Sequence, residues 1–191
     1  NLACFLTTHA HEMAISEYQE AIKLEYDYPD AHVNLGLCFA DAGEHTSAIN
    51  EFRVATELDP GDMGARQELA ASLIDTGEYA EAIRHLKDVV RVEPTNVDAH
   101  IDLGIAYMEQ GFYAEAERCF LSAIESAPDE VLLRYHLAAL YAAWNRPEEA
   151  IRRVGEALEL DRERVLEWLE SDRAFDLFRA DPEFRRLTER R

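Results

Sequence analysis

Apolar residues recur at helical spacing along most of the chain, in paired segments separated by a small hinge residue. In residues 29–60 the first segment carries Leu35 and Phe39, and the second carries Phe52. Such spacing places the apolar side chains on one face of an α-helix. Pro60 follows the second segment, and a proline disfavours helix at the residue before it. The pattern therefore predicts two amphipathic helices joined by a short turn.

The same pattern returns at a fixed interval of 34 residues. The recurring positions are a leucine (Leu35, Leu69, Leu103, Leu137), a hinge glycine (Gly43, Gly77, Gly111), an alanine (Ala14, Ala48, Ala82, Ala116, Ala150) and a closing proline (Pro60, Pro94, Pro128). The glycine permits the left-handed backbone that ends a helix. The alanine lets the axes of the two helices cross closely. A fixed period in this range is typical of stacked helical repeats.

The interval and the pattern L-G-x-x-Y … A-x-x-x-F … P resemble those of the tetratricopeptide repeat. The resemblance covers most of the chain and implies an all-α fold, an α-α superhelix in which antiparallel helix pairs form a right-handed solenoid with a helical C-terminal cap. We expect repeats over residues 1–164, as a partial repeat at 1–28 and full repeats at 29–62, 63–96, 97–130 and 131–164, followed by capping helices at 165–191.

The two ends of the repeat array depart from the pattern. In the partial repeat, residues 9–11 stand where the hinge glycine would be, and only NLACFLTT remains of the first helix. In the last repeat Asn145 replaces the glycine, and asparagine also tolerates the left-handed conformation. Beyond residue 164 the period is lost, and we expect short helices that begin after Asp172 and Asp181, both suitable N-cap residues. The basic end of the chain suits a helix C-terminus, with a basic docking tail as the alternative.

The charge of the chain narrows the class of partner. The formal net charge is −20. Residues 1–160 contain 30 acidic and 11 basic residues, so nearly all of the negative charge lies in the repeats. Binding of nucleic acid or anionic lipid requires basic residues that neutralise phosphates, so neither is expected. No apolar stretch is long enough for direct membrane insertion. The acidity favours a protein or peptide partner that is basic, although a charged surface also serves solubility.

The sequence offers no catalytic, cofactor-binding or metal-binding motif, and we expect a protein that is not an enzyme. No nucleotide-binding glycine loop, zinc-protease helix or nucleophile elbow is present. Cys4, Cys38 and Cys119 lack metal-site spacing and are interpreted as buried thiols, which favours a reducing, cytoplasmic location. His32 and His100 hold the same repeat position, so symmetry explains them better than metal coordination. The chain begins at Asn1 within a helical pattern, so we expect a fragment of a longer protein.

In proteins that resemble this one, the first helix of each repeat lines a concave groove where partners bind. Carried over by position, the groove residues here are Asn34, Leu37, Asp41, Gln67, Ala71, Ile74, Asp75, Ile101, Asp102, Ile105, Met108, Glu109 and Tyr135. The apolar members form a predicted floor, and Asp41, Asp75 and Glu109 share one repeat position and form a predicted acidic row. Such a surface suits an amphipathic helix or extended segment that bears Lys or Arg.

Other interpretations stay open at this point. The floor residues can instead pack against neighbouring first helices, with the acids merely solvated. The chain can also be a self-assembling scaffold whose repeats stack end to end, or a regulatory segment of a larger enzyme such as a glycosyltransferase or kinase. Chaperone adaptors of the family hold acidic peptide tails with Lys, Asn and Arg, whereas the corresponding positions here carry Val33, Gln67 and Ile101, so that ligand is not expected.

Overall fold

The computed structural model describes the backbone of residues 2–189 and the side chains of residues 11–189; of the residues interpreted above, the side chains of Cys4, His9, Arg190 and Arg191 lie outside this range. Within it the structure confirms the all-α class of helical repeats. The chain divides into two compact units, with the boundary between Pro94 and Thr95. Each unit is described by itself.

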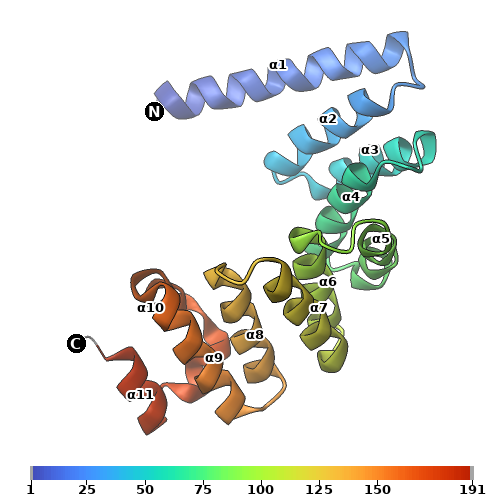
Figure 1. The fold of residues 1–191 in the computed structure, drawn as a ribbon. Helices are drawn as coiled ribbons and strands as arrows, with labels where there is room; N and C mark the ends of the chain where they lie inside the picture. The colour runs from blue at the N-terminus through green and yellow to red at the C-terminus, as the bar shows by residue number, and fades with distance from the viewer. Residues whose placement is uncertain (1, 190–191) are drawn as a thin grey trace. The chain divides into compact units, whose positions relative to one another are not determined.

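The first unit consists of α1 and two helix pairs (Figure 1). Its elements are α1 (Leu2–Leu24), α2 (Pro29–Asp41), α3 (His45–Leu58), α4 (Met63–Asp75) and α5 (Tyr79–Val92). Each helix packs mainly against the next one along the chain, α2 on α3 and α4 on α5, while α3 contacts α4 and α1 contacts α2. This is the stacking expected when each pair covers one face of its neighbour.

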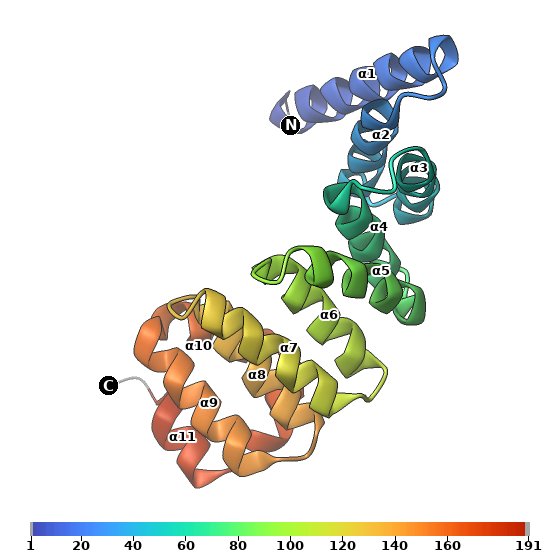
Figure 2. The ribbon, with the colours of Figure 1, turned by 45° about the vertical axis from the view of Figure 1, so that its right-hand side comes forward.

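The second unit continues with two further pairs and the C-terminal elements (Figure 2). Its elements are α6 (Val97–Glu109), α7 (Tyr113–Ser126), α8 (Val131–Ala143), α9 (Pro147–Leu160), α10 (Arg162–Ser171), the 3-10 helix η1 (Arg173–Phe178) and α11 (Pro182–Thr188). The helix α10 packs on α9, η1 on α8, and α11 on α9. No proline follows α9, but the chain still breaks there at Asp161. Its carboxylate accepts a hydrogen bond from the backbone amide of Arg164 and so acts as the N-cap of α10.

The predicted hinges are confirmed in the backbone. Gly43, Gly77 and Gly111 have φ of 76°, 81° and 76°, and Asn145 takes the same conformation with φ of 58°. After each hinge residue the next amide donates back to a carbonyl five residues earlier, as in Glu78 to Leu73 at 2.7 Å and Arg146 to Tyr141 at 2.9 Å. This bond pattern is that of the Schellman motif, which ends a helix and satisfies its last carbonyls.

On each of three first helices, a basic side chain donates a hydrogen bond to a main-chain carbonyl in the turn that precedes the helix. His32 Nε2 donates to the carbonyl of Tyr26 at 3.1 Å, and Arg66 Nη2 donates to that of Pro60 at 2.8 Å. Arg134 makes the equivalent bond to Pro128. All three donors hold one repeat position, and each reaches six residues back. The sequence interpretation noted His32 at this position but missed the arginines that share its role.

The two helices of a pair cross where a small residue faces a large one. Gly36 and Gly104 leave no room for a side chain, because a Cβ at either would lie 2.6 Å from a ring carbon of Phe52 or Phe120. Both rings are fully buried. In the alternate repeats the small residue is alanine and the large one shrinks, giving the pairs Ala70 with Leu86 and Ala138 with Val154. The added methyl group on the first helix thus offsets part of the volume lost on the second.

The expectation of a helical hairpin at the N-terminus is wrong. The structure has one continuous helix, α1, through residues 9–11, where a turn was expected. The physical reason is that this stretch holds neither glycine nor asparagine, so no residue favours the left-handed backbone that a hinge requires. Ala14 and Tyr18 of α1 are half-buried, and α1 packs on α2.

The crossing pairs predict non-additive stability effects. We expect Gly104→Ala to lower the free energy of unfolding by about 1–3 kcal/mol, because the new methyl group overpacks against Phe120. In the double variant Gly104→Ala/Phe120→Leu, which copies the Ala70–Leu86 pair, the loss should fall short of the sum of the single losses by at least about 0.5 kcal/mol. Urea denaturation measures these values. Gly155→Ala is the control, because its Cβ meets only Leu187, at 3.7 Å; additive losses would contradict the steric account.

The hinge predicts a ranking of substitutions at Gly77, whose φ is 81°. Gly77→Val should lower the free energy of unfolding by about 1 kcal/mol or more, because a β-branched residue is strained in the left-handed region. Gly77→Asn should cost clearly less, as Asn145 already occupies the equivalent hinge. Thermal denaturation followed by circular dichroism compares the two, and equal melting temperatures would count against a conformational cause.

Candidate functional site

The predicted partner-binding residues of the first unit lie on α2 and α4. The apolar Leu37, Ala71 and Ile74 are half-buried, as are the polar Asn34 and Gln67. These apolar side chains therefore retain surface that a partner can contact. Half-burial also means that other parts of the protein cover some of each residue, so burial alone does not choose between the two interpretations of the floor. Their role in docking stays a prediction.

The members of the acidic row are the last residues of their helices. Asp41 ends α2, Asp75 ends α4 and Glu109 ends α6, and all three are exposed. The partial negative charge at a helix C-terminus disfavours an acid there and favours a cation, by about 0.3–1 kcal/mol per charge. The fold alone therefore gives no reason for carboxylates at these positions. A cation brought to them would gain from the carboxylate and from the helix end together.

Two histidine side chains of the first unit lie near the carboxylates of Asp41 and Asp75. His45 Nδ1 lies 3.3 Å from Asp75 Oδ2, and His11 Nε2 lies 4.0 Å from Asp41 Oδ2. His11 Nε2 also donates to the carbonyl of Cys38 at 3.1 Å. The two histidines are 34 residues apart, as are the two aspartates, so the pair is a repeated feature. The sequence contained this signal in its period, and the interpretation above missed it.

Asp41 also shapes the electrostatics of its neighbours. Burial, and then the negative charge of Asp41, raise the pKa of Glu68 above its ordinary value. The same two causes raise the pKa of the Cys38 thiol. A thiol with a raised pKa carries less of the reactive thiolate near neutral pH. Cys119 is buried, as expected, so neither described cysteine has the setting of a nucleophile.

The second unit carries its predicted residues on α6 and α8. On α6 the apolar Ile101, Ile105 and Met108 are half-buried, as is Asp102. Ile105 and Met108 pack against the core of this unit with part of their surface still open. The acid Glu109 at the end of α6 is exposed. A single groove that runs through both units stays a prediction.

Tyr135 does not line an open groove, which corrects the sequence-based placement. It is 7% exposed, and its hydroxyl donates to Asp172 Oδ2 at 2.8 Å. The rings of Trp168 and Phe175 lie against it, with centroids 5.0 and 5.6 Å away. Burial and the hydrogen bond to Asp172 raise the pKa of Tyr135 far above its ordinary value. The C-terminal elements therefore occupy this part of α8.

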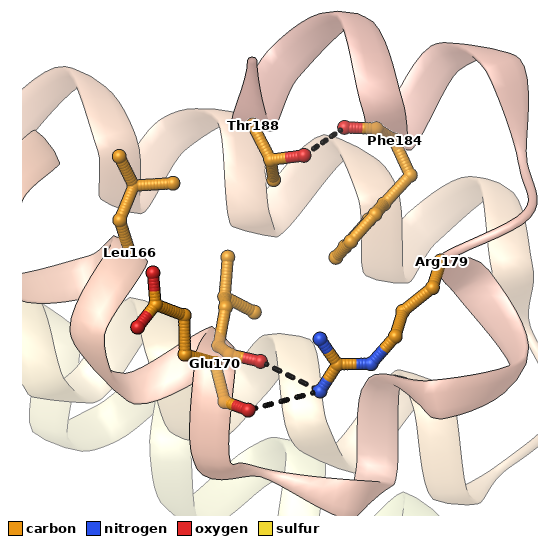
Figure 3. A pocket seen from close by; sticks show the side chains of 6 residues that line it. Leu166, Glu170, Arg179, Phe184 and Thr188 are labelled. Atoms are coloured by element: carbon orange, nitrogen blue, oxygen red, sulfur yellow. Dashed lines mark hydrogen bonds between the residues drawn. The ribbon is translucent and has the colours of Figure 1, made fainter. Parts of the chain in front are cut away.

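The C-terminal elements are held together by arginines that bond to main-chain carbonyls. Arg179 Nη2 donates to the carbonyls of Leu169 and Glu170 at 3.1 and 3.2 Å, at the end of α10 (Figure 3). Arg162 Nη2 donates to the carbonyl of Leu187 at 2.9 Å. A small cavity of about 280 Å³ lies beside Arg179 and Phe184. Because Arg179 is engaged by helix-end carbonyls, its role here is structural.

The described residues contain neither a metal-binding cluster nor a helix that could span a membrane. Among residues 11–189, no three His, Cys, Asp or Glu side chains gather closely enough to hold a metal. His136 stacks on Phe120 with ring centroids 5.6 Å apart, and burial lowers its pKa, so it carries little charge near pH 7. In the same part of the chain, every helix is too short or too polar to cross a bilayer.

Comparison with known proteins gives the repeat family. Two tetratricopeptide repeat models match, one at residues 11–62 and the other at residues 73–132. Among solved structures, a MamA fragment from Desulfovibrio magneticus RS-1 aligns with a TM-score of 0.78 and 23% identity over 83% of this chain and 89% of that one. The protein YrrB, described as a TPR protein with an unusual peptide-binding site, aligns with a TM-score of 0.74 and 18% identity, covering 88% of each chain.

A thermophilic TPR protein of Thermus thermophilus aligns with a TM-score of 0.65 and 22% identity, over 88% of this chain and 95% of that one. At these identities the likeness concerns the fold. The comparison with curated proteins found no match.

The bond between Tyr135 and Asp172 predicts how firmly the C-terminal elements are held. We expect Tyr135→Phe to lower the free energy of unfolding by about 1 kcal/mol or more, because a buried charge-assisted hydrogen bond is lost. Amide hydrogen exchange in η1 and α11 should accelerate, while exchange in the first unit stays unchanged. Tyr28→Phe is the control, since that side chain is 44% exposed. Unchanged exchange in η1 would show that ring packing alone holds this segment.

Proposed function

Because the chain belongs to the tetratricopeptide repeat family, we propose that it is a non-catalytic scaffold or adaptor that binds protein partners through its first helices. The partner is a basic, partly apolar peptide or helix. The observation that carries this proposal is an exposed acid at the end of each of these first helices, α2 and α4 in the first unit and α6 in the second, on helices that also carry half-buried apolar residues. Carboxylates there are disfavoured by their own helices and favoured by an incoming cation.

The residue types divide the work of binding between charge and apolar contact. On α4 the half-buried Ile74 precedes the exposed Asp75 in the sequence, and on α6 the half-buried Met108 precedes the exposed Glu109. An amphipathic segment that carries Lys or Arg next to an apolar side chain matches this order. The strong negative charge of the repeats attracts such a segment from a distance. The half-buried apolar residues then supply contact area once it has arrived.

Reversal of the acidic row tests this proposal. The variant Asp41→Lys/Asp75→Lys/Glu109→Lys should lower the affinity for a Lys-bearing amphipathic peptide at least about tenfold, since three favourable charge contacts become repulsive. Fluorescence anisotropy measures binding, and circular dichroism checks that helicity is retained. Binding to the unmodified protein should weaken as salt is raised.

The control variant replaces three exposed glutamates elsewhere in the repeats with lysine, at Glu57, Glu93 and Glu125. It therefore makes the same change in net charge as the test variant. It should bind the peptide within about twofold of the unmodified protein, since the site itself is left intact. Equal losses in both variants would mean that the total charge, and not the row at the helix ends, attracts the peptide.

A further inference from the structure

A groove runs between α9 and α11 in the second unit, on elements that the proposed function does not use. Its volume is about 820 Å³, and its floor is formed by Ile151, Gly155 and Leu187. Ile151 is 5% exposed and belongs to the core of the unit. This volume lies in the range of sites that bind a ligand or a few side chains of a partner. The groove is therefore large enough for a specific occupant.

A methyl group would fit at Gly155, whereas a longer side chain would have to share the space with Leu187. A Cβ at Gly155 would meet only Leu187, at 3.7 and 3.9 Å, which is ordinary contact. A glycine within a helix lowers its stability compared with alanine. At the same repeat position the other second helices carry large side chains, Arg53, Lys87 and Leu121. Only in α9, among these four helices, is this position without a side chain, and Leu187 of α11 lies next to it.

Glutamates stand at both ends of this groove. Glu148 and Glu149 lie near the start of α9, Glu156 and Glu159 lie near its end, and Glu183 of α11 faces them. At about 1.5 Å per residue, Glu148 and Glu159 at the two acidic ends of α9 are roughly 16–17 Å apart. Arg152 is the one basic residue in the lining, and it lies between the two ends. Along its length the groove therefore has an acidic end, an apolar centre and a second acidic end.

Neighbouring arginines neutralise part of this charge. The ion pairs are Arg146 with Glu149 at 3.8 Å, Arg153 with Glu156 at 2.7 Å and Arg186 with Glu183 at 3.8 Å. The first and third pairs are long and solvent-exposed, so they hold their glutamates weakly. Glu148 and Glu159 have no ion pair within 4.0 Å among the described residues, and they mark the two ends at which a cation is best received.

We propose that this groove is a second docking site, which binds a basic amphipathic helix of a partner protein. The helix carries Lys or Arg at both ends of a short centre of small and apolar residues. The centre lies over Gly155 and Leu187, and the basic ends meet Glu148 and Glu159. Charge complementarity selects this occupant, and the missing side chain at residue 155 gives it close access. The site does not depend on the faces of the first helices.

Binding of a designed peptide to the full chain tests the proposal. The probe is a labelled helical peptide of about 16 residues with two Lys at each end and an Ala- and Leu-containing centre, which spans the groove at helical rise. We expect Glu148→Lys/Glu159→Lys and, separately, Gly155→Leu to weaken binding at least about tenfold. Gly155→Leu restores the side chain that Leu121 supplies in α7, and a thermal melt checks that α11 stays folded. Arg152→Ala should strengthen binding, because it removes the repulsive charge.

The matched control is Glu125→Lys/Asp129→Lys, which makes the same change in net charge. Glu125 holds the repeat position of Glu159 on α7, and both control residues are exposed. This variant should bind within about twofold of the unmodified protein. Equal weakening by the control, or full binding by Gly155→Leu, would overturn the proposal. So would loss of binding in the Asp41→Lys/Asp75→Lys/Glu109→Lys variant alone, which would place the peptide on the first helices.

Discussion

The close crossing of two helices within each repeat is the contact on which the rest of the structure depends. At Gly36 and Gly104 the partner ring lies where a side chain would begin, so the helix axes are fixed by direct contact of backbone and aromatic ring. A core this dense tolerates neither an added methyl group nor a lost one without cost. From repeat to repeat one residue of the pair grows as the other shrinks, so the change at one helix offsets part of the change at the other.

This constraint separates the positions of the repeat into two kinds. Positions at the crossing and the hinge are set by packing and backbone conformation, and they vary only in compensating ways. Positions at the end of the first helix are free of that constraint, yet Asp41, Asp75 and Glu109 are all acidic there. A helix end gains nothing from such a residue. Within the first unit each of these aspartates has a histidine nearby, His11 at 4.0 Å from Asp41 and His45 at 3.3 Å from Asp75.

Much of the fold was predictable from the sequence because its determinants are local and repeated. A hinge residue at a fixed offset defines each turn, and even the substitution at Asn145 kept the predicted conformation. The continuity of α1 was missed because the repeat pattern was extended into a stretch that lacks a hinge residue. The burial of Tyr135 was not predictable, since it depends on Asp172, a residue 37 positions away with no place in the repeat. The repeat pattern predicts the contacts that all repeats share, but it does not predict a contact that occurs in only one repeat.

For the candidate site too, the repeat pattern predicts where residues lie on their helices but not how far they are buried. Periodicity placed Ile74 and Ile105 correctly on the first helices, because a position in the repeat fixes a position on the helix. It gave no measure of how far neighbouring helices cover them, and the structure shows them half-buried. The groove at Gly155 is not predictable from the period, because no other repeat has a glycine at this position. It became visible only from the residue that breaks the pattern, in a repeat with the C-terminal elements packed beside it.

Charge and apolar contact contribute differently to binding at such surfaces. Exposed acids speed the encounter with a basic partner and select its orientation, but salt screens them, and each exposed pair adds little affinity. Affinity has to come from apolar area that is covered on binding and was not already covered by folding. Ile105 and Met108 retain such area, whereas the surface of Tyr135 is already covered by Trp168 and Phe175. The part of α8 around Tyr135 is therefore closed to partners for as long as η1 stays packed against it.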